Sequence, residues 1–291
     1  MDAPFFIVAS ARSGTTAVRL TLNAHPSVAV PPESRFITEL WNGSETVVAD
    51  DFLRDLAVHQ RFKSWELPIE AVAEQIGDRS SLPYEEAIAC AYRAYAARHG
   101  KSRWGDKTPR YIEHIPFLKK LFPDARFIHP VRDGRDVALS YSHVSFGPKT
   151  VAKAAELWRR RVAAGIRDGR ALPAGDYIEI RNEDLKEDFE GEVRDICAFL
   201  GLDFDPVMLD ETEREKGAVR KEQHNYDPAH AGRKAMSDWR TEMKPSDVEV
   251  FEAVAGDVLS ELGYERRFPA PSALARLKAR LGLMGLPLNR L

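Results

Sequence analysis

The stretch FFIVASARSGTTAVRL, residues 5–20, predicts a buried strand, a turn of small polar residues and the start of a helix. Its first four residues form a continuous apolar run, which is typical of a strand covered on both faces in a parallel sheet. From Thr15 onward, Val18 and Leu22 recur at helical spacing. Backbone N–H groups and the helix dipole favour an anion at such a helix start, so the stretch predicts an anion-binding loop.

The predicted loop departs from a Walker phosphate-binding loop, which needs a glycine, four residues, a second glycine, a lysine and then Ser or Thr. Gly14 could be the second glycine, but Ala9 stands at the first position and Thr15 stands where the lysine would be. That lysine neutralises β- and γ-phosphates, so its absence argues against a nucleoside triphosphate. An ordinary polar turn is the alternative. The residues expected to hold an anion are Arg12, Ser13, Gly14, Thr15 and Thr16.

The rest of the chain alternates predicted strands with predicted helices. Strands are predicted at residues 28–30, 126–131 and 177–180, and helices at residues 84–99, 151–167, 189–200 and 246–263, the last opening on a capping box of Ser246 and Glu249. This alternation predicts a three-layer α/β fold, with a central parallel sheet and helices on both faces. We expect a single domain over residues 1–267, with residues 35–81 as an insertion on the substrate side.

A second candidate anion site lies in HPVRDGRDVALSY, residues 129–141. Arg132 leaves the end of a predicted strand, and Ser140 lies about two helical turns further on. Ligands bind at the carboxyl edge of open α/β sheets, so both side chains could reach one anion there. In the alternative interpretation, Arg132, Asp133, Arg135 and Asp136 only pair with one another at a helix start.

Composition excludes several classes of protein. Forty-two basic and forty-five acidic residues leave a net charge of −3, so nothing in the total predicts nucleic-acid binding. Cys90 and Cys197 lack the spacing of metal ligands and are expected to be buried thiols in a reducing compartment. Neither a signal peptide nor a membrane-spanning run is evident, which predicts a soluble, cytoplasmic protein.

Together the two motifs resemble those of sulfotransferases that use 3′-phosphoadenosine 5′-phosphosulfate (PAPS). The resemblance extends from residue 5 to about residue 265 and implies a P-loop-NTPase-like sulfotransferase fold. It implies that RSGTT holds the 5′-phosphosulfate and that the element with Arg132 and Ser140 holds the 3′-phosphate. PAPS would be the donor, 3′-phosphoadenosine 5′-phosphate (PAP) the product, and no metal would be needed.

The resemblance also implies a catalytic base. The stretch RSGTTAVRLTLNAHPSVAVPPESRF, residues 12–36, is similar to that of tyrosylprotein sulfotransferases and their bacterial relatives. Those enzymes use a glutamate, and Glu33 lies at the same distance from the loop. The histidine of the cytosolic small-molecule enzymes is replaced by Pro109, and His114 is a weaker substitute. On the residues alone, the alternative is a surface glutamate after a Pro-Pro turn.

Further contacts follow from the same resemblance. Lys107 of WGDKTP is implied to lie beside the bridging oxygen, with Arg12 as a second cation, although an isolated lysine is more often a solvated loop residue. GRKAMSDW, residues 232–239, resembles a late loop that touches the 3′-phosphate through two residues equivalent to Arg233 and Lys234. Asn182 replaces a tyrosine that commonly contacts adenine, so the adenine pocket is expected to differ.

The predicted reaction is transfer of a sulfuryl group to a hydroxyl, or an amine, of a small molecule, sugar, lipid or peptide. An ATP-dependent small-molecule kinase with a degenerate loop and a non-catalytic PAPS or PAP sensor are the alternatives. Residues 211–238 are either a surface loop or a lid over the ligand. Residues 268–291 form a basic amphipathic tail, expected to pack on this domain or on a homodimer partner, with a membrane surface as the alternative.

Overall fold

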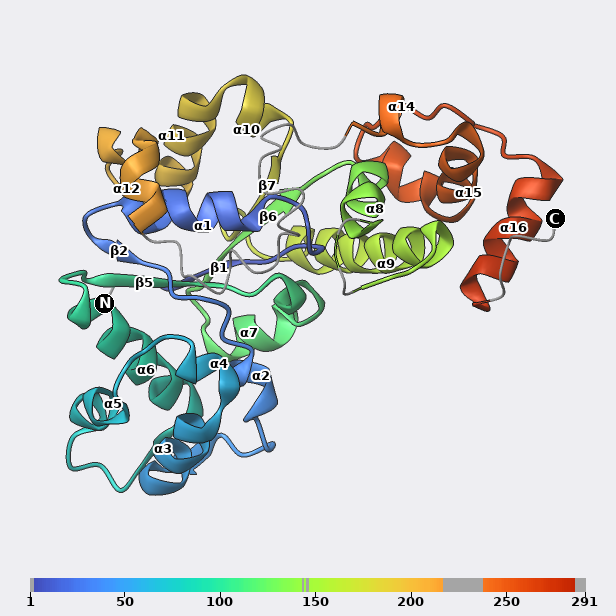
Figure 1. Cartoon of the computed structure of the whole chain (residues 1–291). Helices are drawn as coiled ribbons and strands as arrows, with labels where there is room; N and C mark the ends of the chain where they lie inside the picture. Colours follow the sequence, from blue (N-terminus) through green and yellow to red (C-terminus); the bar gives the residue numbers. More distant parts are fainter. Residues whose placement is uncertain (1–2, 143, 145–146, 217–237, 286–291) are drawn as a thin grey trace.

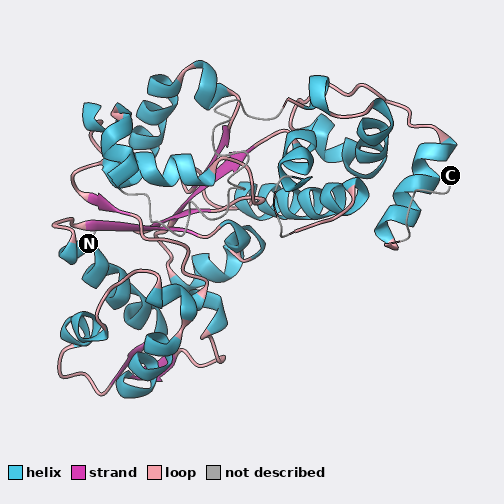
Figure 2. Cartoon of the chain, in the orientation of Figure 1, coloured by secondary structure: helices cyan, strands magenta, loops and turns pink. Residues whose placement is uncertain are grey.

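The computed structural model describes residues 3–142, 144, 147–216 and 238–285 of the chain (Figure 1). Five strands form its central sheet in the order β2-β5-β1-β6-β7, with every pairing parallel. These strands are β1 (Phe5–Ile7), β2 (Val28–Ala29), β5 (Arg103–Lys107), β6 (Arg126–Val131) and β7 (Tyr177–Arg181). Figure 2 shows the sheet between helices. The predicted α/β fold with a central parallel sheet is confirmed.

The central strand β1 explains why helices cover both faces of the sheet. Phe5 and Ile7 belong to one core cluster and Phe6 to the other, because successive side chains of a strand point to opposite faces. The helices on the face of Phe5 are α1 (Thr15–Ala24), α10 (Asp184–Glu187) and α11 (Phe189–Leu200), and those on the face of Phe6 include α6 (Tyr84–Arg98) and α7 (Ile115–Leu121). Each of the three residues is fully buried.

A further group of helices packs beside the sheet around the buried residues Trp158 and Phe251. It comprises α8 (Gly134–Ser142), α9 (Val151–Arg170), α14 (Trp239–Glu242) and α15 (Pro245–Glu261), and α16 (Ala273–Leu283) packs on α9 and α15 at one end of the molecule (Figure 1). The predicted capping box of α15 is wrong. Its helix begins at Pro245, and the Glu249 carboxylate instead accepts a hydrogen bond from the backbone N–H of Ser272 at 2.8 Å.

The region predicted as an insertion forms a small helical layer against α6. Its elements are α2 (Phe36–Glu39), β3 (Thr46–Val48), α3 (Ala49–Val58), α4 (Gln60–Lys63), α5 (Ile69–Ile76) and β4 (Ser81–Pro83). β3 and β4 pair antiparallel as a separate two-stranded sheet. Aromatic side chains join this layer to the main core, with Phe36 and Trp65 rings 5.1 Å apart.

Strand β5 was not predicted from the sequence, and it places Lys107 at the end of a central strand instead of in a solvated loop. Its sequence, RWGDK, has no apolar run. All five residues are nevertheless buried, because β5 lies between β1 and β2. Arg103 donates to the carbonyl oxygen of Leu200 at 2.8 Å, and Gly105 leaves room for the Phe5 ring. Long-range partners therefore bond several polar groups of this strand, whereas Asp106 Oδ1 is buried without a partner among the described residues.

Short elements complete the chain: η1 (Pro109–Glu113), η2 (Pro206–Leu209) and α12 (Glu211–Lys216). The predicted lid over residues 211–238 falls mostly outside the described residues, as do Arg233 and Lys234. Among the residues that the structure describes, no helix combines the length and the apolar character needed to cross a bilayer. Cys90 and Cys197 are both buried free thiols.

Candidate active site

The predicted anion-binding loop connects β1 to α1 and has the backbone that such a loop requires. Gly14 lies just before α1 with a φ of 84°, in the left-handed region that favours glycine. A β-carbon at this position would overlap the side-chain oxygen of Asn182. Thr15 and Thr16 open the helix, so their N–H groups belong to its first turn, which has no intrahelical acceptors. The loop therefore presents a helix N-terminus beside Asn182.

Two serines in this loop have buried hydroxyls that no described residue satisfies. The side-chain oxygens of Ser10 and Ser13 are buried without a hydrogen-bond partner in the described part of the chain. Leaving such a group unpaired costs about 1–3 kcal/mol, so these hydroxyls are available to a bound anion. Sequence reasoning found Ser13 and missed Ser10, whose only signal is its place just after the buried strand.

The two predicted anion motifs meet at one place. The Arg12 guanidinium donates from Nε to the Ser140 hydroxyl at 2.9 Å, and Arg132 donates to the carbonyl oxygen of Arg12 at 3.4 Å. Arg132 is only 5% exposed, and burial lowers the pKa of its guanidinium. The loop after β1 and the start of α8 after β6 thus place two arginines and a serine hydroxyl together at the carboxyl edge of the sheet.

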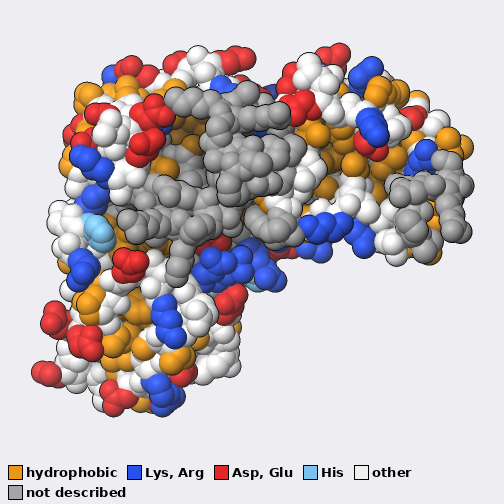
Figure 3. Space-filling model, viewed as in Figure 1, with side chains coloured by type: hydrophobic (Ala, Val, Ile, Leu, Met, Phe, Trp, Pro, Cys, Tyr) orange, Lys and Arg blue, Asp and Glu red, His pale blue; other side chains and the backbone are white. Residues whose placement is uncertain are grey.

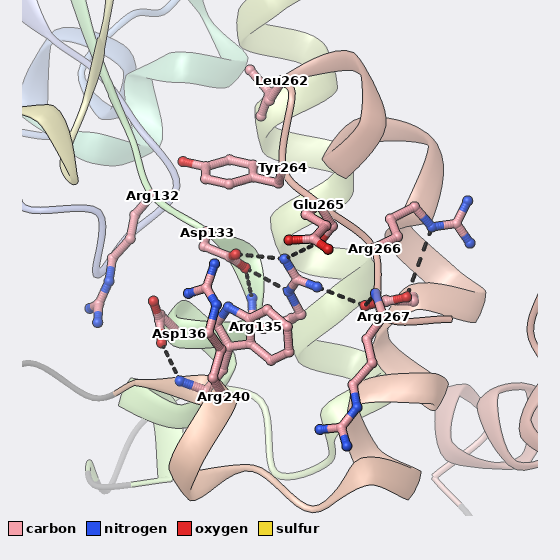
Figure 4. Close-up of polar contacts among 12 residues, drawn as sticks. Arg132, Asp133, Arg135, Asp136, Arg240, Leu262, Tyr264, Glu265, Arg266 and Arg267 are labelled. Atoms are coloured by element: carbon pink, nitrogen blue, oxygen red, sulfur yellow. Dashed lines mark hydrogen bonds and ion pairs between the residues drawn. The ribbon is translucent and has the colours of Figure 1, made fainter. Parts of the chain in front are cut away.

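Arg135, the second arginine of the VRDGRD motif, lies in a buried cluster away from Arg132 (Figure 4). Arg135 is fully buried and bonds both oxygens of Asp133, at 3.0 and 2.7 Å, and one oxygen of Glu252, at 2.7 Å. Its guanidinium also stacks 3.6 Å from the Trp239 ring centre. Figure 4 shows Arg132 pointing away from this cluster. The alternative interpretation, in which the charged residues of the motif pair with one another, therefore holds for Arg135. Arg132 belongs to the candidate site.

Asp136 holds the start of α14 by a hydrogen bond. Its carboxylate accepts a hydrogen bond from the backbone N–H of Trp239 at 2.8 Å. Burial raises the pKa of Asp136 to about 6, although the nearby Arg132 opposes this shift. The start of α14 is thereby fixed beside Arg132.

Glu33 and Lys107 lie together at the end of β5. The Lys107 ammonium donates to a Glu33 carboxylate oxygen at 3.3 Å, and the second oxygen lies 3.8 Å from Arg35. The Lys107 side chain is 3% exposed and that of Glu33 is 26% exposed, so the carboxylate faces the solvent-accessible side of the pair. Because Ile7 pairs with Lys107 in register, the pair adjoins the loop that follows β1.

A buried polar network holds the segment that carries Glu33. The Ser34 hydroxyl lies 3.0 Å from the Tyr111 hydroxyl, and the Ser34 N–H donates to Thr108 at 3.1 Å. Asp106 accepts hydrogen bonds from Tyr92 at 2.6 Å and from Thr108 at 3.3 Å. Burial raises the pKa of Asp106 to about 6. Sequence reasoning missed this network, because its residues share no local motif.

A cavity of about 160 Å³ lies beside the loop, between α1 and α11. Its lining includes Ala17, Val18, Asn182, Leu185 and Phe189. Asn182 therefore contacts both Gly14 and this mostly apolar space. Among the described residues, no group of three or more His, Cys, Asp or Glu side chains is placed to hold a metal ion.

The geometry agrees with the comparisons with known proteins. The sequence profile of the Sulfotransferase family matches residues 4–206, so the chain belongs to that family. The chain is 28% identical to nodulation protein NoeE of Sinorhizobium fredii over 293 residues, covering 90% of this chain but only 66% of that protein. It is 25% identical to protein-tyrosine sulfotransferase 1 of Danio rerio over 292 residues, covering 93% of this chain and 75% of the relative.

A solved structure supports the fold. The sulfotransferase domain of the Synechococcus PCC 7002 olefin synthase superposes with a TM-score of 0.58, at 24% identity, over 91% of this chain and 97% of that domain. This similarity shows the sulfotransferase fold that the two motifs implied. The resemblance to tyrosylprotein sulfotransferases and bacterial relatives is likewise confirmed.

Proposed function

We propose that this protein transfers a sulfuryl group from PAPS to a hydroxyl-bearing acceptor. One observation carries the proposal: the anion loop, Lys107 and Arg132 lie at the carboxyl ends of three adjacent parallel strands, β1, β5 and β6, at the same edge of the sheet. A donor with phosphate groups at both ends needs two anion sites joined in this way. The hydroxyls of Ser10 and Ser13, which have no partner in the described part of the chain, support the fit.

The donor would supply an activated sulfuryl group, and the residues of the chain have separate roles toward it. The N–H groups of residues 13–16 and the serine hydroxyls would bind the 5′-phosphosulfate. Arg132 and Ser140 would bind the 3′-phosphate, with Arg233 and Lys234 as further expected contacts. The cavity at Asn182 adjoins the loop and would accept the adenine, in place of the tyrosine contact that the family commonly uses.

In the transfer itself, Glu33 would act as the general base. The acceptor hydroxyl gives its proton to the Glu33 carboxylate while its oxygen bonds to sulfur. The bond from sulfur to the bridging oxygen breaks, and the electron pair stays on the 5′-phosphate of PAP. Lys107 and Arg12 would stabilise that developing charge. Their cationic groups supply the required positive charge, so we expect transfer to persist when divalent metals are chelated.

The acceptor is proposed only as a class. Relatives include an enzyme named for protein tyrosine, so a phenolic or alcoholic hydroxyl on a peptide, lipid, sugar or small molecule is the expected group. Arg35 lies 3.8 Å from Glu33 and begins the insertion, so residues 35–81 would shape the acceptor side of the pocket.

Calorimetric titration with PAP and with ADP, in the absence of metal, tests the donor. We expect micromolar binding of PAP, about −8 kcal/mol, and much weaker binding of ADP, which lacks the 3′-phosphate. Arg132→Ala should weaken PAP binding about 10- to 100-fold, because a hydrogen-bonded charge contact is lost. Arg98→Ala, on the exposed end of α6, is the control. Equal affinity for ADP, or PAP binding indifferent to Arg132, would contradict the proposal.

The two alternatives give different results. A kinase would transfer phosphate from MgATP, and membership of the sulfotransferase family disfavours it. A sensor would bind PAP without turnover. Release of PAP from PAPS in the presence of phenolic and alcoholic acceptors separates a sensor from an enzyme.

A further inference from the structure

The C-terminal helix α16 packs on the domain through its small residues. Ala275 and Ala279 are buried against Ala152 and Val250, in a cluster of α9, α15 and α16. Gly282 lies in the same face, where a β-carbon would come within 2.8 Å of that of Ala152. Hydrogen bonds fix both ends: Ser272 caps the helix and donates to Glu249, and Thr150 donates to the Gly282 carbonyl oxygen at 3.4 Å.

Three leucines of α16 and its C-cap residue Met284 lie on another face. Leu274, Leu277, Leu281 and Met284 follow one another at spacings of three and four residues, which places them in one stripe along a helix. Leu274 is 55% exposed, Leu277 47% and Met284 72%, whereas Leu281 is partly exposed. Leu283, which is 39% exposed, lies outside the stripe. Figure 3 shows hydrophobic side chains at the surface at this end of the molecule. A surface helix normally buries its large apolar residues, so α16 has the reverse arrangement.

Basic residues border the stripe. Lys278 and Arg280 lie on opposite sides of the stripe around the helix. Arg276 and Arg280 are exposed, and Lys278 is partly exposed. Residues 268–291 contain no acidic residue. Exposed leucines between cations are typical of helices that lie in a membrane interface, where the leucines enter the acyl boundary and the cations meet anionic headgroups.

We propose that α16 docks this protein onto the surface of an anionic lipid bilayer through the stripe of Leu274, Leu277, Leu281 and Met284. A second copy of the chain fits less well. In a two-fold interface, α16 of one copy would face α16 of the other. Lys278 and Arg280 would then lie near the same cations of the second copy, and α16 has no carboxylate to pair with them. The anchoring on α9 and α15 would hold the helix parallel to the bilayer surface as a preformed element.

Vesicle flotation tests this surface without reference to enzyme activity. Full-length protein is mixed with vesicles of phosphatidylcholine alone, or of phosphatidylcholine with about one third phosphatidylglycerol, at low and at physiological salt. We expect binding to the anionic vesicles that weakens with salt. Lys278→Glu with Arg280→Glu should lower the partition coefficient at least about 30-fold, since each basic residue near such a surface contributes about fivefold. Leu274→Ser with Leu277→Ser should lower it at least about tenfold.

Matched controls carry the same chemical changes elsewhere. Val58→Ser alters another exposed apolar residue, 62% exposed on α3, and Lys63→Glu with Arg98→Glu reverses two exposed cations outside the tail. These controls should bind vesicles almost as wild type does, and circular dichroism should show all variants folded. Binding unaffected by the α16 variants, or absent in wild type, would overturn the proposal. Leucine variants that dissociate an oligomer in light scattering without changing vesicle binding would assign the stripe to a second copy instead.

Discussion

The two halves of the candidate site differ in how their polar groups are satisfied. Beside β1 and β6, the hydroxyls of Ser10 and Ser13 are buried without a partner among the described residues, as in a site built to receive an anion. Beside β5, the side chains of Ser34, Thr108 and Tyr111 bond to one another, and the one carboxylate oxygen of this network without a partner among the described residues is Asp106 Oδ1. We infer that the first half binds and the second half positions Glu33 and Lys107.

Changes at Glu33 and Lys107 should give the largest effect. Glu33→Gln removes the proposed base while keeping an oxygen for Lys107, so kcat should fall about 100- to 10,000-fold. Lys107→Met should lower kcat about 100- to 1,000-fold, because it removes charge stabilisation of the leaving group. Affinity for PAP by calorimetry should change much less with Glu33→Gln than kcat does.

Glu74→Gln, an exposed position on α5, is the matched control and should leave kcat unchanged. A Glu33→Gln enzyme that retains full turnover would remove Glu33 from the mechanism. In that case His114, which joins η1 to α7, would be the next base to test.

The two arginines of VRDGRD offer the next contrast. Arg135→Met should lower the free energy of unfolding by about 3–5 kcal/mol, because Asp133 and Glu252 would remain buried without their cation. Arg132→Met should change the free energy of unfolding much less and weaken PAP binding instead. Urea unfolding together with calorimetry measures both quantities.

A double variant guards against a failure to fold. Arg135→Met with Glu252→Gln removes one of the stranded charges and should recover part of the lost stability. Similar unfolding free energies for the two single variants would contradict the separation of a structural arginine from a binding one.

Much of the fold, and of the part of the candidate site beside β1 and β6, could be predicted from the sequence. A continuous apolar run, a small-residue turn and a helical period are local features, and they located β1, the loop and α1. The same is true of Arg132 and Ser140, which follow a predicted strand within one contiguous motif. Local patterns suffice where one segment contains both the element and its functional group.

The part of the candidate site beside β5 could be predicted from the sequence only in part. Lys107 was singled out by resemblance, but RWGDK gives no strand signal, because it has no apolar run. Its Arg103 is held by the carbonyl oxygen of Leu200, a partner far away in the sequence. Ser34 and Tyr111 are 77 positions apart, so no spacing rule connects them. Arg233 and Lys234 lie outside the described residues, and their roles stay predictions.

The pH dependence of stability tests the burial of Asp106. Its folded pKa, raised to about 6 from an ordinary 3.8, means that its contribution to stability is greatest at about pH 4 and is lost as pH rises through 6. The amide side chain introduced by Asp106→Asn would be neutral throughout this range. The unfolding free energy of Asp106→Asn, relative to wild type, should therefore increase by up to about 3 kcal/mol between pH 4 and pH 7.

Asp257→Asn should show the opposite sign, and mainly below about pH 4, since a hydrogen bond from Arg159 lowers the pKa of that carboxyl from its ordinary 3.8. Taking differences from wild type removes the contributions of Asp136 and His129, which are present in every protein compared. If the difference in unfolding free energy between Asp106→Asn and wild type does not change between pH 4 and pH 7, Asp106 is ionised in the folded protein at no cost in stability.

Tyr111→Phe should give the smallest effect and tests positioning most directly. The Tyr111 hydroxyl lies 3.0 Å from Ser34 Oγ and accepts from the N–H of Ile37 at 3.1 Å, so its loss should cost about 1–3 kcal/mol of stability. If the network orients Glu33, kcat falls severalfold while PAP affinity is unchanged. Tyr84→Phe is the matched control, because its hydroxyl donates to the Ile37 carbonyl oxygen at 2.9 Å without contacting Ser34. Equal kcat losses in both variants would assign the effect to general loosening of residues 34–37, and a loss confined to Tyr111→Phe would tie it to the Ser34 link beside Glu33.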